Sequence, residues 1–575
     1  MVFEALQRIS LILVGAVVLG VVWRYAGRGR WREALTDRFV YGVPWGSLIT
    51  ILLVVGFYLF AQSGLESWSD PVVIAFRSWS YDYLFGMLAA GFAHSGPSHL
   101  MGNMVGAAVL SPLVEYAWGH YPPSAREQRE NADHTTQRES EFAATQREPE
   151  YAYPPPGELP PVVDEPQSTS GGFFSRPLVR ALIVFPVAVI IISILTSFFA
   201  RGWSLGYSGT VFFFLGFAAV KLPLATVVGV VVMSGVNVLF SAFQTPIVTA
   251  GLSTGAPSPP SWAGVNVQAH ILGFLLGVVL AFELSRRREE WPRVGYLALA
   301  VVTVALAQQL WSISGSGGGT FVRYQALGVV FVFFLSLLVI SMVSIENETV
   351  YGRLTVRGLI GGGIVLIIIV VAMSSVQFNL PGMADDPVPE GGVVEIEDYS
   401  ITYTDSAPHG RVSGNSSGVI VVSEEREIWA QAVSRNRLAF DGEGSVTVGG
   451  LGWRETVDVE RHAWNVAGNE TVYAVSLEHD ERVHAFDSPS KEAGGSLVGH
   501  TFSLRSTPDG FTVEVRVDNE RVGETAVPDR NETTTVALSD PASVSELTVT
   551  TRERDGTDEL FVESEGTRVL VATKG

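Results

Sequence analysis

A serine and a histidine, far apart in the chain, are the two residues best suited to do chemistry together. Ser208 stands in the run Gly206-Tyr-Ser-Gly209, and His270 lies inside a long apolar segment. A serine hydroxyl is a weak nucleophile until a base takes its proton, and imidazole, with an ordinary pKa of about 6.5, is such a base near neutral pH. We therefore predict Ser208 as the nucleophile and His270 as the general base of a hydrolysis.

A second polar cluster, His94-Ser-Gly-Pro-Ser-His99-Leu-Met-Gly-Asn103, opens another apolar segment. His99 and Asn103 are four residues apart, so they share one face of a helix. Both can donate hydrogen bonds to the oxyanion that forms when a hydroxyl attacks an amide carbonyl. Polar groups inside apolar spans are costly, so each of them calls first for a functional hypothesis.

Glycines surround both predicted reactive residues. Gly206 and Gly209 flank Ser208, where they permit a tight turn and the close approach of another helix. Gly273 and Gly277 form a G-x-x-x-G stripe after His270, a pattern typical of closely packed membrane helices. The glycines are predicted to bring the helices of Ser208 and His270 together.

The composition indicates a membrane protein, because 47% of the 575 residues are hydrophobic and the mean hydropathy is +0.29. A span needs roughly 20 apolar residues. About ten such segments are predicted, near residues 6–23, 45–62, 98–118, 179–199, 206–220, 223–241, 266–284, 294–312, 322–344 and 357–376.

Arginine placement predicts the orientation of these spans. The loops after the first, third and seventh spans are rich in arginine and are predicted to be cytoplasmic, whereas residues 242–264 and 313–320 contain no Lys or Arg. Both chain ends and all three polar clusters are then predicted on the outer side of the cell membrane. The arginines concerned are Arg24, Arg28, Arg30, Arg32, Arg38, Arg126, Arg129, Arg138, Arg147, Arg286, Arg287, Arg288 and Arg293.

Two regions differ in composition from the spans. Residues 119–176 are rich in Glu, Arg, Gln, Pro and Ser and are predicted to be a disordered cytoplasmic insertion. Residues 377–575 contain short alternating apolar stretches separated by Gly, Asp and Asn, which predict an extracellular all-β sandwich-like domain. This tail holds 36 acidic and 16 basic residues, so it carries the whole formal net charge of -20.

The composition also narrows the chemistry. The chain has no cysteine, which excludes disulfides and thiolate chemistry. No H-E-x-x-H motif or carboxylate cluster indicates a metal, so no metal or other cofactor is predicted, and nucleic acid is not a predicted partner. Only three basic residues are lysines, and an arginine-rich, acidic composition of this kind is associated with salt-loving archaea.

The three polar clusters, in this order and spacing, resemble the rhomboid family of intramembrane serine proteases over about residues 45–285. The resemblance implies a six-helix core in which Ser208 is the nucleophile, His270 the base, and His99 and Asn103, with the Ser208 backbone N–H, the oxyanion hole. It also implies that Phe212 packs on the catalytic histidine and that His94 is a structural polar residue in the active-site entrance. Glu115 would tie inner helix ends together.

One position departs from the family. Many rhomboids carry Trp-Arg in the first outer loop, whereas the corresponding stretch here reads Tyr83-Leu-Phe-Gly86, without arginine. Outside the family motifs, His120 at the end of the third span is predicted only as an interfacial residue.

The predicted fold is a polytopic α-helical membrane protein with a six-helix rhomboid-like core, extra transmembrane helices and a β domain. Residues 1–43 are predicted as an extra helix with an arginine-rich loop, 44–285 as the core, 286–376 as three added helices and 377–575 as the acidic β domain. None of the added parts is expected to belong to the catalytic core.

The predicted reaction is hydrolysis of a peptide bond near the outer end of a substrate's transmembrane helix, with membrane proteins and the lipid bilayer as partners. Two alternatives stay open: a catalytically inactive relative that binds transmembrane clients, and an extracellular adhesion or receptor module anchored by the spans. The presence of both Ser208 and His270 favours activity.

Overall fold

The computed structural model describes residues 5–10, 12–13, 16–17, 34–121, 172–247, 259–317, 320–345, 348–351, 354–380, 388–408, 415–468, 470–538 and 547–575. Most of the predicted insertion at 119–176 and the predicted arginine-rich loop at 24–32 lie outside the described residues.

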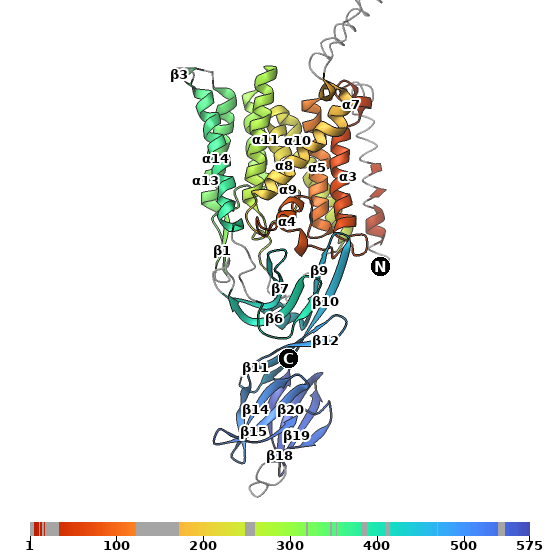
Figure 1. The fold of residues 1–575 in the computed structure, drawn as a ribbon, viewed down its shortest axis with the longest axis vertical. Coiled ribbons are helices and arrows are strands. Elements are labelled where there is room, and N and C mark those ends of the chain that lie inside the picture. The colour runs from red at the N-terminus through yellow and green to blue at the C-terminus, as the bar shows by residue number, and fades with distance from the viewer. Residues whose placement is uncertain are drawn as a thin grey trace, which may run out of the picture.

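A bundle of long helices forms one half of the molecule and a β region the other half (Figure 1). The bundle consists of α3 (Trp45–Gly56), α4 (Leu84–Ala89), α5 (Pro97–Trp118), α7 (Pro177–Val179), α8 (Phe185–Phe198), α9 (Ser208–Lys221), α10 (Pro223–Gln244), α11 (Val267–Arg288), α12 (Val294–Ala307), α13 (Gln325–Ser344) and α14 (Val356–Asn379). A π-helical turn extends α3 to Ala61, and another joins α7 to α8.

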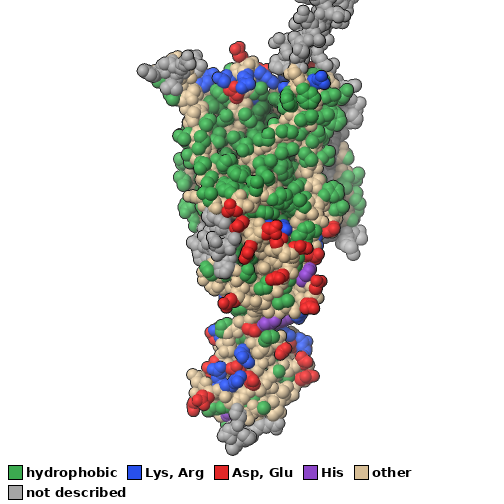
Figure 2. Space-filling view, viewed as in Figure 1, with side chains coloured by type: hydrophobic (Ala, Val, Ile, Leu, Met, Phe, Trp, Pro, Cys, Tyr) green, Lys and Arg blue, Asp and Glu red, His purple; other side chains and the backbone are tan. Residues whose placement is uncertain are grey.

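Six of the described helices are long and apolar enough to cross a membrane, and three shorter ones are apolar as well. On the face that Figure 2 shows, apolar side chains cover the bundle between a rim of Lys and Arg at one end and the β region at the other. The long helices are Pro97–Trp118, Pro177–Phe198, Pro223–Gln244, Val267–Arg288, Gln325–Ser344 and Val356–Asn379, and the shorter ones are Trp45–Ala61, Ser208–Lys221 and Val294–Ala307. The prediction of a multi-pass helical membrane protein is confirmed.

The nine spans predicted from residue 45 onward coincide with these helices, with differences of up to five residues at their ends. The span predicted at 294–312 already ends at Ala307, and the span predicted at 357–376 continues to Asn379. Of the first predicted span, the described residues between 5 and 17 are helical. Arg8 in this helix donates from Nε to the carbonyl of Phe243, near the end of α10, at 3.0 Å.

The β region comprises residues 388–575 and is built from antiparallel strands. The strands are β5 (Val394–Ile396), β6 (Tyr399–Pro408), β7 (Asn415–Ser423), β8 (Ile428–Ser434), β9 (Glu443–Gly450), β10 (Trp453–Val466), β11 (Glu470–Glu478), β12 (Arg482–Asp487), β13 (Lys491–Leu497), β14 (His500–Thr507), β15 (Gly510–Val517), β16 (Glu520–Ala526), β17 (Thr533–Thr535), β18 (Ala537–Leu538), β19 (Thr548–Arg554), β20 (Thr557–Ser564) and β21 (Thr567–Lys574). A short helix, α15 (Arg435–Asp441), follows β8, and two small hairpins, β1 (Ser314–Gly317) with β2 (Thr320–Arg323) and β3 (Thr349–Tyr351) with β4 (Leu354–Thr355), connect helices of the bundle.

The β region has two large hydrophobic cores where the sequence predicted a single sandwich-like domain. One core lies among β5 to β12 and contains Tyr403 and Val459, and the other lies among β10 to β21 and contains Trp464 and Phe502. The long strand β10 contributes to both, because it pairs with β9 and β11 along most of its length and with β21 at its end.

The first β core rests directly on the loop that joins α3 to α4. Trp79 of this loop is buried among the residues of that core. Arg454 of β10 pairs with Asp70 of the loop at 2.9 Å, and the N–H of Gly452 donates to the carbonyl of Ala61 at 3.0 Å. The β region therefore covers the end of the bundle at which α5, α9 and α11 begin.

At the opposite end of the bundle, Glu115 and His120 join helix ends. The buried Glu115 carboxylate accepts hydrogen bonds from the N–H groups of Gly46 and Ser47, each at 2.8 Å, and its Oε1 lies 2.6 Å from His120 Nε2. His120 is itself buried and accepts from the Val40 N–H at 2.9 Å. His120 is therefore buried where helix ends pack together, whereas the sequence predicted only an interfacial residue.

Candidate active site

The structure places Ser208 and His270 in direct contact. Ser208 is the first residue of α9, and His270 lies in the first turn of α11. His270 Nε2 lies 2.8 Å from Ser208 Oγ, a normal hydrogen-bond distance. Because the first N–H groups of a helix have no partner within it, the Ser208 N–H stands at the positive end of α9.

Glycines let α9 and α11 touch backbone to backbone. A Cβ on Gly273 would lie 2.0 Å from the Gly209 carbonyl oxygen, and one on Gly277 would lie 2.1 Å from the Phe213 carbonyl oxygen. The same holds in the other direction, since a Cβ on Gly216 would lie 2.0 Å from the Phe274 carbonyl oxygen. No larger residue fits at these positions without moving a helix.

Phe212 lies one turn after Ser208 and stacks on the ring of His270. The two ring centroids are 4.1 Å apart and the ring planes differ by 13°. With Ser208 on its edge and Phe212 on its face, the imidazole is held in one orientation.

His99 and Asn103 lie in the first two turns of α5 and face the loop before Ser208. Gly206 in this loop has a φ of +120°, and a Cβ there would lie 2.7 Å from His99 Nε2 and 3.6 Å from Asn103 Nδ2. A glycine is therefore required for the close approach and favoured by the backbone conformation. The three polar clusters, distant in the sequence, meet at one end of the bundle.

His94 binds Asn103 and is buried. Asn103 Nδ2 lies 3.0 Å from His94 Nε2, and His94 Nδ1 lies 3.0 Å from the Phe92 carbonyl oxygen. This geometry fits a neutral His94 that donates from Nδ1 and accepts from Asn103 at Nε2. The ring of His99 has a separate partner, because Ser95 Oγ lies 3.2 Å from His99 Nδ1.

Sequence reasoning missed Gln62, which holds His94 in place. Its Oε1 accepts from the His94 N–H at 2.8 Å, and its Nε2 donates to the carbonyls of His94 at 2.9 Å and Val72 at 2.7 Å. Gln268 and Asn379, which bind the loop before Ser208, were missed as well. A lone amide within or at the end of an apolar segment was the available signal in each case.

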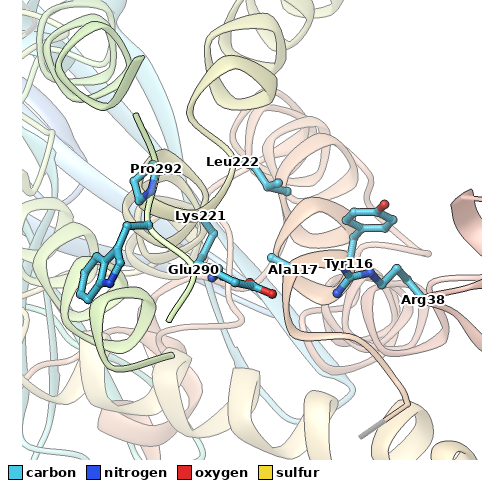
Figure 3. Close-up of a pocket in the computed structure, with 8 residues that line it drawn as sticks. Arg38, Tyr116, Ala117, Lys221, Leu222, Glu290 and Pro292 are labelled. Carbon is cyan, nitrogen blue, oxygen red and sulfur yellow. Dashed lines mark hydrogen bonds and ion pairs between the residues drawn. The ribbon is translucent and has the colours of Figure 1, made fainter. Parts of the chain in front are cut away.

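The opposite end of the bundle holds a small pocket of about 130 Å³ between Arg38, Tyr116, Lys221 and Glu290 (Figure 3). Lys221 pairs there with Glu290 at 3.0 Å. Lys221 is the last residue of α9 and Ser208 the first, so about 20 Å of helix separates this pocket from the serine. Among the described residues, no group of three or more His, Asp or Glu side chains could hold a metal ion.

A comparison with known families identifies the segment that carries the serine and the histidine. The family model of the rhomboid domain matches residues 175–287. The chain carries a rhomboid domain over this segment. The match runs from α7 into α11 and includes both Ser208 and His270, whereas His99 and Asn103 lie before it. No curated protein and no solved structure matches the chain.

Rhomboid proteins are typically intramembrane serine proteases, and inactive members exist. In this chain the geometry of Ser208 and His270 allows the chemistry of an acyl transfer. The Ser208 hydroxyl can pass its proton to His270 Nε2, and the N–H of Ser208 and the side chains on α5 are donors on the neighbouring side.

Proposed function

We propose that this rhomboid protein is an intramembrane serine endopeptidase that uses Ser208 as nucleophile and His270 as general base. The observation that carries the proposal is the 2.8 Å contact between Ser208 Oγ and His270 Nε2, built from two helices that can approach only through their glycines. A serine that merely filled space in a helix interface would not need an imidazole at hydrogen-bond distance.

The proposed reaction has two steps. Ser208 Oγ attacks the scissile carbonyl while His270 takes the hydroxyl proton, and His270 then returns that proton to the leaving amine. Water hydrolyses the acyl-enzyme by the same route. The Ser208 N–H, His99 and Asn103 donate to the oxyanion, and Asn103 must exchange its bond to His94 for one to the substrate.

The proposed orientation puts the site and the β region on the outer face of the cell membrane. Basic residues gather at the end of the bundle away from the β region (Figure 2). At this end Arg286 to Arg288 form the last turn of α11, and Arg180 donates to the Gly119 carbonyl just after α5. Loops rich in Lys and Arg stay on the cytoplasmic side of membrane proteins. The C-terminal β region is therefore extracellular in this proposal.

The proposed substrates are transmembrane proteins, reached from within the lipid bilayer. Ser208 is at the first residue of α9, so the bond to be cut must lie near the outer end of a substrate helix. A helix satisfies its own backbone hydrogen bonds in lipid, so the substrate must unwind locally before its carbonyl is accessible.

Cleavage of a single-span reporter by the purified protein in lipid, at high salt, tests the proposal. We expect product with the parent and a loss on the order of 10⁴-fold or more with Ser208→Ala and with His270→Ala. Ser234→Ala is the matched control, because Ser234 is a membrane serine on α10 whose hydroxyl donates only to the Val230 carbonyl, at 2.9 Å.

A parent protein that captures several reporters without cutting any of them would replace the protease by a client-binding membrane protein. Product that is unchanged in Ser208→Ala would indicate a contaminating protease. Either result would overturn the proposed function.

A further inference from the structure

The added helix α14 ends in a buried amide that binds the loop leading to Ser208. Asn379, its last residue, is fully buried. Its Nδ2 donates to the Ala200 carbonyl at 2.8 Å, and its Oδ1 accepts from the Gly202 N–H at 3.0 Å. Both groups belong to the loop 199–206, which leads from the end of α8 to Tyr207, the residue before α9.

The backbone of Asn379 binds a second loop. Its carbonyl accepts from the Tyr81 N–H at 2.9 Å, in the loop between α3 and α4. The same two loops pair with each other, because the Trp203 N–H donates to the Ser78 carbonyl and the Ser78 N–H to the Ser204 carbonyl, each at 3.0 Å. Asn379 thus joins the two loops that meet under the β region.

The loop continues from these contacts directly to the candidate active site. Gly202 and Trp203 have φ values of +40° and +49°, so the chain turns sharply beside Asn379. Four residues further on, the Gly206 N–H donates to the Ala90 carbonyl at 2.8 Å, and Gly206 then packs on the ring of His99. A shift of the backbone at Gly202 would move Gly206 and, with it, Ser208.

A second amide connects α14 to the helix of His270. Gln268, two residues before His270, donates from Nε2 to the Phe199 carbonyl at 2.7 Å and to the Val371 carbonyl of α14 at 2.8 Å. Its Oε1 accepts from the Arg201 N–H at 3.2 Å. The start of α11 and the loop 199–206 are therefore both bound to α14.

We propose that Asn379 is a positioning residue for the proposed protease: it fixes the backbone of residues 200–206 and so aligns Ser208 with His270 and the oxyanion donors. The inference rests on the proposed function and gives an added helix a part in the catalytic architecture. An amide suits this position because the loop presents one carbonyl and one N–H, which an aliphatic side chain would leave unpaired.

The test compares Asn379→Leu and Asn379→Ala with the parent in the full-length protein in lipid. Ser375→Ala is the matched control, because Ser375 is buried one turn earlier on α14 but its hydroxyl donates only to Ala372 of the same helix, at 2.7 Å. The kinetic readouts are kcat and KM on a single-span reporter and the rate at which a fluorophosphonate probe labels Ser208.

We expect kcat and the labelling rate of both Asn379 variants to fall about 10-fold to 100-fold, the scale on which misplaced groups lose rate. KM should change less than about twofold, since the loop contacts align the serine without holding the substrate helix, and Ser375→Ala should match the parent. If an Asn379 variant merely lost folded protein, the amount of active enzyme would instead fall in step with the thermal stability of that variant. The inference fails if kcat of Asn379→Leu equals that of the parent.

Hydrogen exchange of the backbone amides in residues 199–206 decides the structural part independently of any activity. Asn379→Leu should speed exchange there, with Gly202 foremost, whereas Ser375→Ala should not. Unchanged exchange overturns the inference even if activity falls. A parent that cuts no reporter and reacts with no probe overturns the proposed protease function, and faster exchange in Asn379→Leu would then still establish the loop contact.

Discussion

Two parts of the candidate active site are held together in opposite ways. The α9–α11 pair, which carries Ser208 and His270, is a contact of backbone on backbone with no side chain at Gly273 and Gly277. The loops on the other side of Ser208 are held by single amides that reach across to backbone groups, such as Gln62 and Asn379.

The two arrangements are vulnerable to different substitutions. The α9–α11 contact requires glycine at these positions, so one added methyl group is enough to force the helices apart. The loops depend on a few buried hydrogen bonds, so they should tolerate small changes in volume but lose their alignment when one amide is removed. Substitutions in each part, ordered by the size of the loss that we expect, test this contrast.

Gly277→Val should cause the largest loss. The new side chain would begin 2.1 Å from the Phe213 carbonyl oxygen, a backbone atom that cannot move alone. We expect a destabilisation of about 3 kcal/mol or more and no measurable cleavage. Thermal unfolding and the reporter assay measure both, with Gly235→Ala as control because a Cβ at Gly235 meets nothing within 4 Å. A stable and active Gly277→Val protein would show that the helices are not locked by this contact.

Asn103→Ala should lower kcat about 100-fold to 1000-fold with little change in KM, as expected for a donor that acts in the transition state. The effect requires that Asn103 leave His94, its partner 3.0 Å away, during the reaction. Steady-state kinetics on the reporter measure it, with the thermal midpoint as a check on folding. A fall of less than about threefold would remove Asn103 from the oxyanion hole.

Gln62→Leu should have an intermediate effect, and it tests the part of the site that is held by buried amides. The change keeps the volume but leaves the Gln62 partners unpaired, namely the His94 N–H and the carbonyls of His94 and Val72. A buried unpaired group costs about 1–3 kcal/mol, so the thermal midpoint should drop and kcat should fall about tenfold through His94 and Asn103. If only the midpoint changes, Gln62 supports the fold without aligning the site.

Arg454→Ala should have the smallest effect, because its ion pair with Asp70 lies at the edge between the β region and the bundle. The Asp70 side chain is 55% exposed, and exposed pairs contribute about 0.2–1 kcal/mol before screening by salt. We expect cleavage at the parent rate and a stability change that vanishes at high salt. A large loss of activity would instead make this contact part of the active-site alignment.

Much of this architecture could be predicted from the sequence, because the signals are local. Apolar length is a property of each segment, so the helices from residue 45 onward appeared at nearly the predicted places. The chemistry of Ser208, His270, His99 and Asn103 could be named from residue type and spacing. The structure brings all four to one end of the bundle.

Other features depend on partners that a local pattern does not reveal. The span predicted to end at residue 376 stops before Asn379, and nothing in the apolar run shows that this amide binds residues near 200. The alternating strands of the tail indicate β structure, but their division into two cores follows from the way in which β10 pairs with β9, β11 and β21.

Local patterns in the sequence were enough to predict membrane spans, a C-terminal β region, and three polar clusters in an order that resembles the rhomboid family. That α14 binds the loop before Ser208 and the start of α11, and that the β region rests on the loop of Asp70 and Trp79, emerges only in the folded chain. The reason is physical. Hydropathy and reactivity belong to residues and short segments, whereas the partner of a buried amide is set by chain elements about 180 residues away.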